Sequence, residues 1–207
     1  MTTISQLMRE SSMSDHKTAE NASFIKDLMA GELSAADYTR YLNQMVYVYQ
    51  AMEKKLPDAA PLPFAPELKR FDSMVADLEK LGVENWSETP MLPATAEYVA
   101  RIEAIGGIED VRLLAHHYTR YLGDLSGGQA IGALVRRHYG LTEEQTSFYH
   151  FAQIEAVVPF KEGYRAAVDD LVMTDDELLL LVAEVRTAFK LNQRLFIELG
   201  DSELIAA

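Results

Sequence analysis

The residues best suited to chemistry lie in a glycine-rich stretch, where Asp124 stands among Gly123, Gly127 and Gly128. The residues on either side favour a helix, so we expect this stretch to be helical as well. A glycine inside a helix costs about 1 kcal/mol relative to alanine. The four glycines between positions 123 and 132 therefore forfeit about 3–4 kcal/mol, and some other gain must offset that loss.

Two gains are available from these glycines. Glycine allows another backbone or a flat ligand to approach the helix axis closely, and it allows the helix to bend. Gly123 and Gly127 share a helix face because they are four residues apart. The same spacing suits close contact between helices, so both interpretations stay open. A carboxylate at a bend, where backbone groups are released to bind water, suits proton delivery, and Asp124 is the candidate catalytic residue.

Helices must position this carboxylate, because apolar residues recur at helical spacing along almost the whole chain. Capping boxes at Ser34–Asp37, Thr142–Gln145 and Thr174–Glu177 predict three helix starts. Four prolines between positions 57 and 66 predict a loop. We predict an all-α fold in a single domain, 1–207, with helices at about 3–14, 15–30, 34–56, 67–81, 94–105, 109–138, 143–156, 158–171 and 175–199.

The composition excludes several classes of function. A formal net charge of -13 disfavours nucleic-acid binding, which needs clustered Lys and Arg. The absence of cysteine removes disulfides, thiolate ligands and iron–sulfur clusters. No secretory signal or apolar run long enough to cross a bilayer is present, and the chain ends without an apolar tail. We therefore expect a soluble, cytoplasmic protein without a membrane anchor.

Four segments that span essentially the whole chain form a specific pattern. The most specific is YTRYLGDLSGGQ at 118–129. The others are HKTAEN at 16–21, FKEGYR at 160–165 and AFKLNQRLF at 188–196. In their sequences, order and spacing these segments resemble the heme oxygenase family. The resemblance implies an all-α fold in which heme is sandwiched between a proximal helix and a kinked distal helix.

The resemblance also implies roles for individual residues. His16 would be the axial ligand of the heme iron, and Glu20, one helical turn further on, could orient its imidazole. Asp124 would hold water on the distal face, where Gly123 and Gly127 lie against the heme plane. Lys161, Arg165 and Tyr118 would meet the propionates, and Arg9 stands where relatives often carry lysine. The remaining candidate heme contacts are Gly128, Phe189, Asn192 and Phe196.

The reaction implied is oxidative cleavage of heme, which is then both cofactor and substrate. Dioxygen and electrons from a ferredoxin or an NAD(P)H-dependent reductase would convert it to biliverdin, carbon monoxide and Fe²⁺. Lys161 and Arg165, on one helix face, could fix the rotation of heme and so choose the meso carbon. An acidic donor would dock on a local basic patch, for which the candidates are Lys17, Lys26, Lys161 and Arg165.

Other interpretations compete with this one. A non-catalytic heme carrier or sensor would share His16 and the pocket, and only the Asp124 region indicates turnover. A di-iron carboxylate protein is disfavoured because no Glu-x-x-His pair is present. A pure interaction module would bind no heme. Phe189 and Phe196 suit the apolar core as well as a heme contact, and we expect His116 and His117 to support the fold rather than to bind metal.

Overall fold

The computed structural model describes residues 2–201, and this part of the chain contains helices and loops but no β-strand. The all-α prediction is confirmed. The α-helices are α1 (Ile4–Glu20), α2 (Ser23–Ala30), α3 (Ala35–Glu53), α4 (Phe71–Lys80), α5 (Pro93–Glu103), α6 (Val111–His117), α7 (Gln129–Tyr139), α8 (Val157–Asp169) and α9 (Asp175–Gly200). Within the described residues, no helix combines the length and the apolar character needed to cross a membrane.

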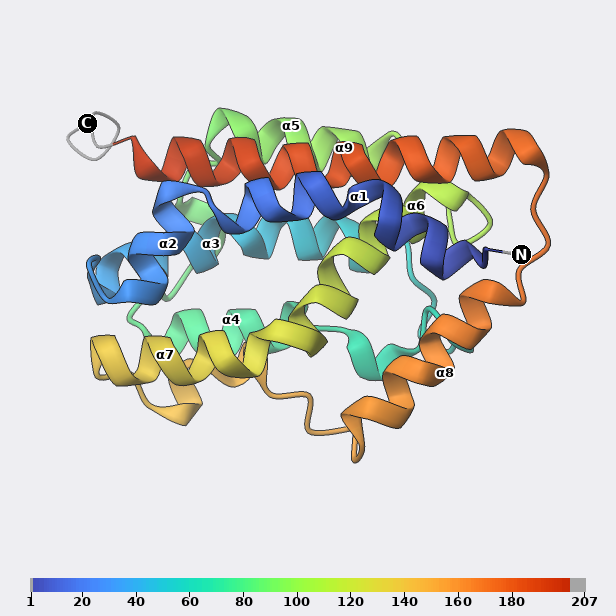
Figure 1. The fold of residues 1–207 in the computed structure, drawn as a ribbon. Coiled ribbons are helices and arrows are strands. Elements are labelled where there is room, and N and C mark those ends of the chain that lie inside the picture. The colour runs from blue at the N-terminus through green and yellow to red at the C-terminus, as the bar shows by residue number, and fades with distance from the viewer. Residues whose placement is uncertain (1, 202–207) are drawn as a thin grey trace.

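The helices form two layers joined by an oblique helix (Figure 1). The long helices α1 and α9 lie side by side, and α9 also packs against α2, α5 and α6. On the opposite side lie α4 and α7, and α8 crosses obliquely near them. Residues 111–139, which we call the glycine-rich helix, run diagonally from α6 to α7 and pass beneath α1 in this view.

Two of the three predicted capping boxes begin long helices, and in both cases the residues that follow carry an apolar face. Ser34 and Asp37 form a reciprocal capping box at the start of α3, and Thr174 and Glu177 do the same for α9. Thr142 and Gln145 also form a capping box, but it begins only the short turn Glu143–Gln145. The predicted loop over positions 57–66 is confirmed as far as Ala65, and Pro66 begins the short 3-10 turn Pro66–Leu68.

The predicted break between helices 3–14 and 15–30 is wrong, because α1 continues to Glu20. Hydroxyl groups of this stretch bond within the continuous helix: Ser12 Oγ donates to the Met8 carbonyl at 2.7 Å, and Thr18 Oγ1 donates to the Ser14 carbonyl at 3.0 Å. The chain leaves the helix at Asn21, whose side-chain amide donates to the Lys17 carbonyl.

The predicted helix 143–156 is also wrong, since the chain there makes two short turns and then an irregular path. Asp77, a buried residue of α4, accepts from the backbone amides of Ser147 and Phe148, both at 2.9 Å. A side chain from another helix thereby takes amides that a helix over 143–156 would bond to its own carbonyls four residues earlier. Phe148 and Phe151 are still buried in the core.

The core contains an unusual number of buried tyrosines, including Tyr38, Tyr49, Tyr98, Tyr121 and Tyr164. A buried phenol requires a hydrogen-bond partner for its hydroxyl. Four of these hydroxyls, all except that of Tyr38, bond to side chains of other elements. The interior therefore carries polar networks, and these networks converge on the glycine-rich helix.

Candidate functional site

The glycine-rich helix changes its winding at its centre. Between α6 and α7, the segments Tyr118–Leu122 and Asp124–Gly128 form wide π-helical turns. Thr119 Oγ1 donates to the Ala115 carbonyl at 2.8 Å, a back-bond that favours bending of a helix. π-Turns are frequent where a helix carries a functional residue. The predicted interruption of this helix is therefore confirmed, with Asp124 inside it.

The glycines of this helix serve two different faces. A Cβ added to Gly128 would lie 3.1 Å from the Tyr149 ring, and one added to Gly132 would lie 3.0 Å from it. These two glycines therefore make the close packing contact that the spacing also allowed. At Gly123 and Gly127 an added Cβ would meet no described atom within 4 Å. Only this second pair leaves backbone accessible to a flat ligand, and Gly128 lies on the packed face.

Asp124 is held from two directions and is largely shielded, with 11% of its side chain exposed. The Tyr49 hydroxyl of α3 donates to Oδ2, and Arg120 Nη2 donates to Oδ1 at 3.2 Å. Burial raises the pKa of this carboxyl, although the charge of Arg120 and the Tyr49 hydrogen bond act in the opposite direction. The result is an oriented carboxyl group that holds a proton more readily than an exposed aspartate.

Arg120 extends this site through the interior. Its Nη1 donates to Asn192 Oδ1 at 2.8 Å, and its Nε donates to the Tyr49 hydroxyl at 3.2 Å. The amide of Asn192 in turn donates to the Tyr98 hydroxyl at 3.3 Å. The sequence interpretation missed Tyr49, Arg120 and Tyr98. Only Arg120 had a usable signal, its i, i+4 spacing to Asp124.

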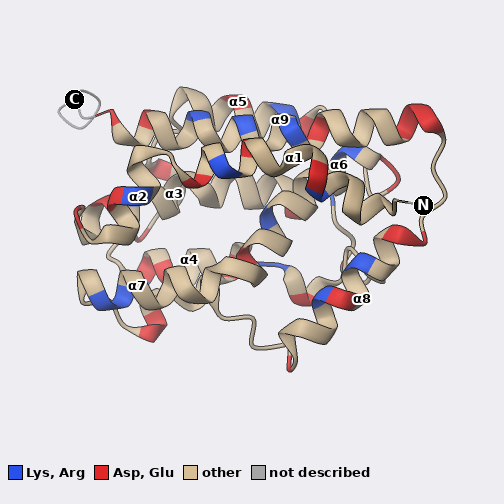
Figure 2. Cartoon of the chain, viewed as in Figure 1, with Lys and Arg blue, Asp and Glu red and all other residues tan. Residues whose placement is uncertain are grey.

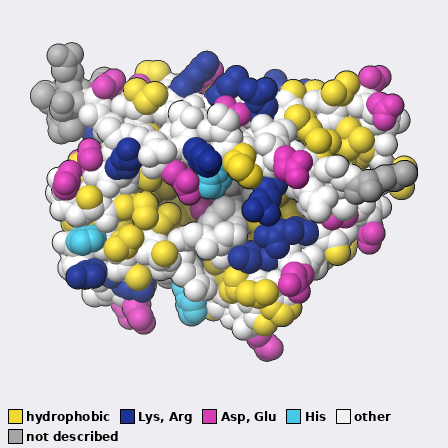
Figure 3. Space-filling view, in the orientation of Figure 1, with side chains coloured by type: hydrophobic (Ala, Val, Ile, Leu, Met, Phe, Trp, Pro, Cys, Tyr) yellow, Lys and Arg dark blue, Asp and Glu magenta, His cyan; other side chains and the backbone are white. Residues whose placement is uncertain are grey.

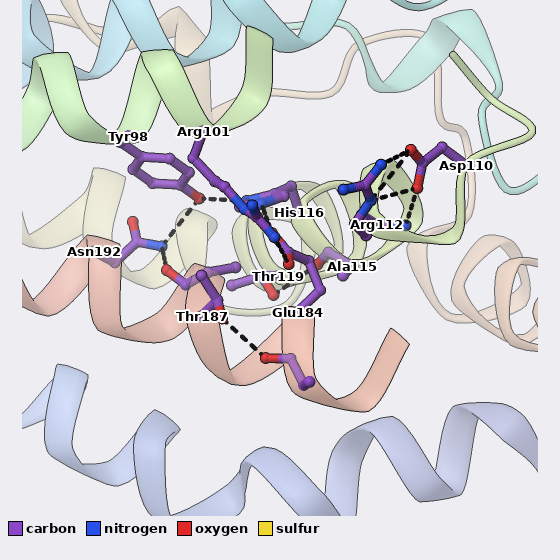
Figure 4. Close-up of polar contacts among 12 residues, drawn as sticks. Tyr98, Arg101, Asp110, Arg112, Ala115, His116, Thr119, Glu184, Thr187 and Asn192 are labelled. Carbon is purple, nitrogen blue, oxygen red and sulfur yellow. Dashed lines mark hydrogen bonds and ion pairs between the residues drawn. The ribbon is translucent and has the colours of Figure 1, made fainter. Parts of the chain in front are cut away.

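The network continues to an ion pair between α5 and α9 (Figure 4). The Tyr98 hydroxyl lies 3.5 Å from His116 Nδ1, and His116 Nε2 lies 2.8 Å from Glu184 Oε1. Arg101 of α5 completes the chain by binding the Glu184 carboxylate through Nε, at 2.8 Å, and Nη2. His116 is therefore a buried structural residue, in accord with the expectation for it.

His16 has the surroundings of an available ligand. Its side chain is 52% exposed on α1, and Nδ1 lies 3.4 Å from Glu20 Oε2. Among the described residues, none hydrogen-bonds to Nε2. The Phe189 ring of α9 lies edge-on to the imidazole, with 5.5 Å between ring centroids. The predicted His16–Glu20 pair is thus present, and Nε2 remains available for a ligand within the described residues.

Basic side chains gather at one edge of the region between α1, α8 and the glycine-rich helix (Figures 2 and 3). Burial raises the pKa of Tyr118, while the charges of Arg165 and Arg9 oppose that shift, which places both arginines near the phenol. Lys161 Nζ lies 3.4 Å from Ser126 Oγ. Among the described residues, no acid forms an ion pair with Arg9, Lys161 or Arg165, so an anionic group would find unpaired cations here.

The three candidates on α9 are all buried. Phe189 contacts His16, Phe196 packs against Tyr41 at 6.2 Å between centroids, and Asn192 bonds to Arg120. Phe196 and Asn192 therefore belong to the core and to the polar network in this structure. Phe189 alone reaches the exposed imidazole.

These residues fit a flat ligand with an anionic edge. Gly123 and Gly127 provide the bare backbone that such a ligand needs, and His16 provides a nitrogen donor for a metal at its centre. Arg9, Lys161 and Arg165 provide the positive charge for its edge. Heme has this combination of a planar ring, a central iron and two carboxylates.

Comparisons with known proteins also show similarity to proteins that bind heme. A profile of the heme oxygenase family matches residues 2–198. The heme oxygenase of Porphyra purpurea is 36% identical over 203 residues, covering 94% of this chain and 86% of its own. The structure is similar to heme oxygenase-1 from the cyanobacterium Synechocystis sp. in complex with heme, with a TM-score of 0.89, 33% identity and coverage of 100% and 96%. Heme oxygenase from Leptospira interrogans gives a TM-score of 0.88 at 36% identity, with coverage of 96% and 100%.

The Glu184 network predicts a loss of stability in acid. Burial alone would raise the pKa of Glu184, but hydrogen bonds from Arg101 and His116 outweigh it and lower the pKa from 4.5 to about 2. Between these values the unfolded chain binds the proton and the folded chain does not, so the free energy of unfolding falls as pH falls from 4.5 to 2, by up to about 3 kcal/mol. Denaturant titrations across this range measure it.

Glu184→Gln should be less stable than the parent protein at pH 7 but should lose less stability below pH 4.5. Glu10→Gln, an exposed carboxylate on α1, is the control and should follow the parent curve. Parallel curves for the parent and Glu184→Gln would contradict the assignment.

Proposed function

This chain belongs to the heme oxygenase family, and we propose that it binds heme and cleaves it with dioxygen and external electrons. The products are biliverdin, carbon monoxide and Fe²⁺, so heme is both the cofactor and the substrate. One observation carries the proposal: the bare backbone at Gly123 and Gly127 lies beside the oriented carboxyl of Asp124. A flat macrocycle needs that close approach, and its oxidation needs a proton source beside it.

His16 would hold the heme iron through Nε2, and Glu20 would orient the imidazole through Nδ1. Gly123 and Gly127 would give the ring a bare backbone to lie against. Arg9, Tyr118, Lys161 and Arg165 would bind the propionates, and these contacts would select the alpha meso carbon for cleavage. Phe189 supports the imidazole, and Gly128, Asn192 and Phe196 act through packing and the Arg120 network.

Bound heme supplies the iron at which dioxygen is reduced and the ring that is oxidised. The protein supplies the proton and its direction. Asp124 holds a proton more readily than an exposed aspartate, because burial raises its pKa. Tyr49 and Arg120 fix its two oxygens, so that the proton passes to water at one defined place above the ligand. A heme carrier or sensor would need His16 and the glycines but not this carboxyl, so Asp124 distinguishes the enzyme from a carrier.

Electrons reach the site from a ferredoxin or an NAD(P)H-dependent reductase in the cytoplasm, as the sequence predicts. The basic edge over α8 and α1 provides a docking surface for an acidic donor, although the chain is acidic overall. Lys17, Lys161 and Arg165 lie on these two helices, whereas the fourth candidate, Lys26, lies on α2 and is not part of this surface. Two of them, Lys161 and Arg165, also hold heme, so Lys17 is the better residue for testing docking alone.

Electron transfer from an acidic ferredoxin should slow several-fold as salt is raised, because screening weakens the charge attraction. Lys17→Glu should slow it further at low salt, whereas Lys80→Glu on α4 should not. Stopped-flow reduction of the ferric heme complex measures the rate. A rate that is indifferent to both salt and Lys17→Glu would refute this docking surface.

Removal of the axial nitrogen should change the spectrum of the heme complex. Purified protein titrated with hemin should bind one equivalent and show a histidine-type absorption spectrum. His16→Ala should lose that spectrum, and added imidazole should restore it by filling the position of the side chain. His150→Ala, at an exposed position, is the matched control. An unchanged spectrum in His16→Ala would assign the ligand elsewhere.

Asp124→Asn should separate binding from turnover. The amide still fits between Tyr49 and Arg120 but cannot hold the acidic proton, so heme should bind while ring opening slows by about 10²-fold or more. The Soret band, biliverdin and carbon monoxide are followed after reductant and air are supplied, with catalase present. Glu144→Gln, an exposed acid, is the control. Unchanged biliverdin yield in Asp124→Asn would leave the carboxyl without this role.

A further inference from the structure

His117, the last residue of α6, occupies an unusual place for a polar side chain. It is 1% exposed, and its Nδ1 lies 3.0 Å from the Tyr164 hydroxyl of α8. Aromatic rings surround it: Tyr121 at 4.4 Å between centroids, Phe64 at 5.0 Å, and Tyr164, which is nearly parallel to it. Within the described residues, Nε2 has no hydrogen-bond partner.

Stability does not explain a histidine at this position. Burial lowers the pKa of His117 to about 3, so the imidazole is neutral near pH 7. A neutral imidazole has one N–H and one acceptor nitrogen, and only one of them is satisfied by Tyr164. The other is left buried without a partner, which is costly. Phenylalanine at both position 117 and position 164 would fill the aromatic cluster without that cost, so the hydrogen bond between the two side chains must have another value.

That bond is one of three side-chain hydrogen-bonded contacts that join α8 to the rest of the described chain. Asp169, at the end of α8, accepts from the amide and hydroxyl of Ser5, and Lys161 lies near Ser126. Both of these attachments are partly exposed. The His117–Tyr164 bond alone is fully buried, in the middle of α8.

The proline-rich loop shields this bond. Phe64 packs on the His117 ring, and the Leu62 side chain lies 3.2 Å from the position that a Cβ of Gly163 would take. Gly163 precedes Tyr164, so the loop covers α8 and α6 at the same place. Water therefore has little access to compete for the bond.

Tyr164 is next to Arg165 and one turn from Lys161. A helix is stiff over one turn, so fixing the Tyr164 hydroxyl also fixes where these two cations stand relative to the glycine-rich helix. Resting on the function proposed above, we propose that His117 is a positioning residue: through Tyr164 it sets α8, and so sets the rotation of heme in its plane and the meso carbon that is cleaved.

Two single-site variants test this. Tyr164→Phe removes the hydroxyl, and His117→Phe keeps an aromatic ring while removing the nitrogen that bonds to that hydroxyl. Tyr139→Phe is the matched control, because it removes a phenol hydroxyl that bonds to the Leu28 carbonyl far from α8. Each protein is loaded with hemin. The methyl resonances of the ferric complex in ¹H NMR report the rotation of heme, and chromatography of the products reports the biliverdin isomers.

The parent protein and Tyr139→Phe should show one rotational orientation of heme, here called its seating, and one biliverdin isomer. Tyr164→Phe and His117→Phe should both show a second seating, and minor isomers should reach about a tenth of the product or more, since one net hydrogen bond changes an equilibrium by about five- to tenfold. Total turnover should stay within about threefold, because Asp124 and its partners are unchanged.

A single seating and an unchanged isomer in both variants, with only their thermal stability reduced, would overturn the inference and leave His117 a structural residue. If the parent binds heme but does not open the ring, the proposed function fails while the seating spectra still decide the role of His117. If the parent binds no heme, both proposals fall.

Discussion

A buried positive charge organises this molecule. Arg120 is only 8% exposed. Burying its charged guanidinium is strongly unfavourable unless the N–H donors find hydrogen-bond partners. Its partners come from separate parts of the chain: Tyr49 from α3, Asn192 from α9 and Asp124 from its own helix. Because the guanidinium is planar and rigid, these three contacts fix how α3 and α9 stand relative to the bend of the glycine-rich helix.

The same charge explains how Asp124 can be both buried and chemically useful. Burial alone raises the pKa of a carboxyl and leaves its orientation free. Pairing with an arginine lowers the pKa, so that the carboxyl gives up its proton more easily. Here burial prevails over Arg120 and Tyr49, so the pKa is raised while both oxygens remain oriented. The wide turns around Asp124 lose regular helix hydrogen bonds, and the polar network holds this segment from α3 and α9.

The sequence predicts local features of this site well and distant ones poorly. His16 and Glu20 are a turn apart, and the glycines and Asp124 lie in one stretch, so helical periodicity alone brings them together. Tyr49, Tyr98 and Glu184 lie on three helices far apart in the chain, and nothing in their own neighbourhoods distinguishes them from ordinary helix residues. The prediction of a helix over 143–156 is wrong for a related reason. Asp77, about seventy residues earlier, accepts from the backbone amides of Ser147 and Phe148, which a helix would have bonded to its own carbonyls.

The glycines show why a resemblance and a physical argument are both needed. Spacing alone allows either a ligand or a packed contact at each of them, and the structure packs one pair and leaves the other bare. Gly128 and Gly132 receive Tyr149, which packs against this helix from the core side, and Gly123 and Gly127 remain bare. Because the interior is closely packed, Tyr149 supports the helix at the packed pair. That support helps to hold the bare pair in place.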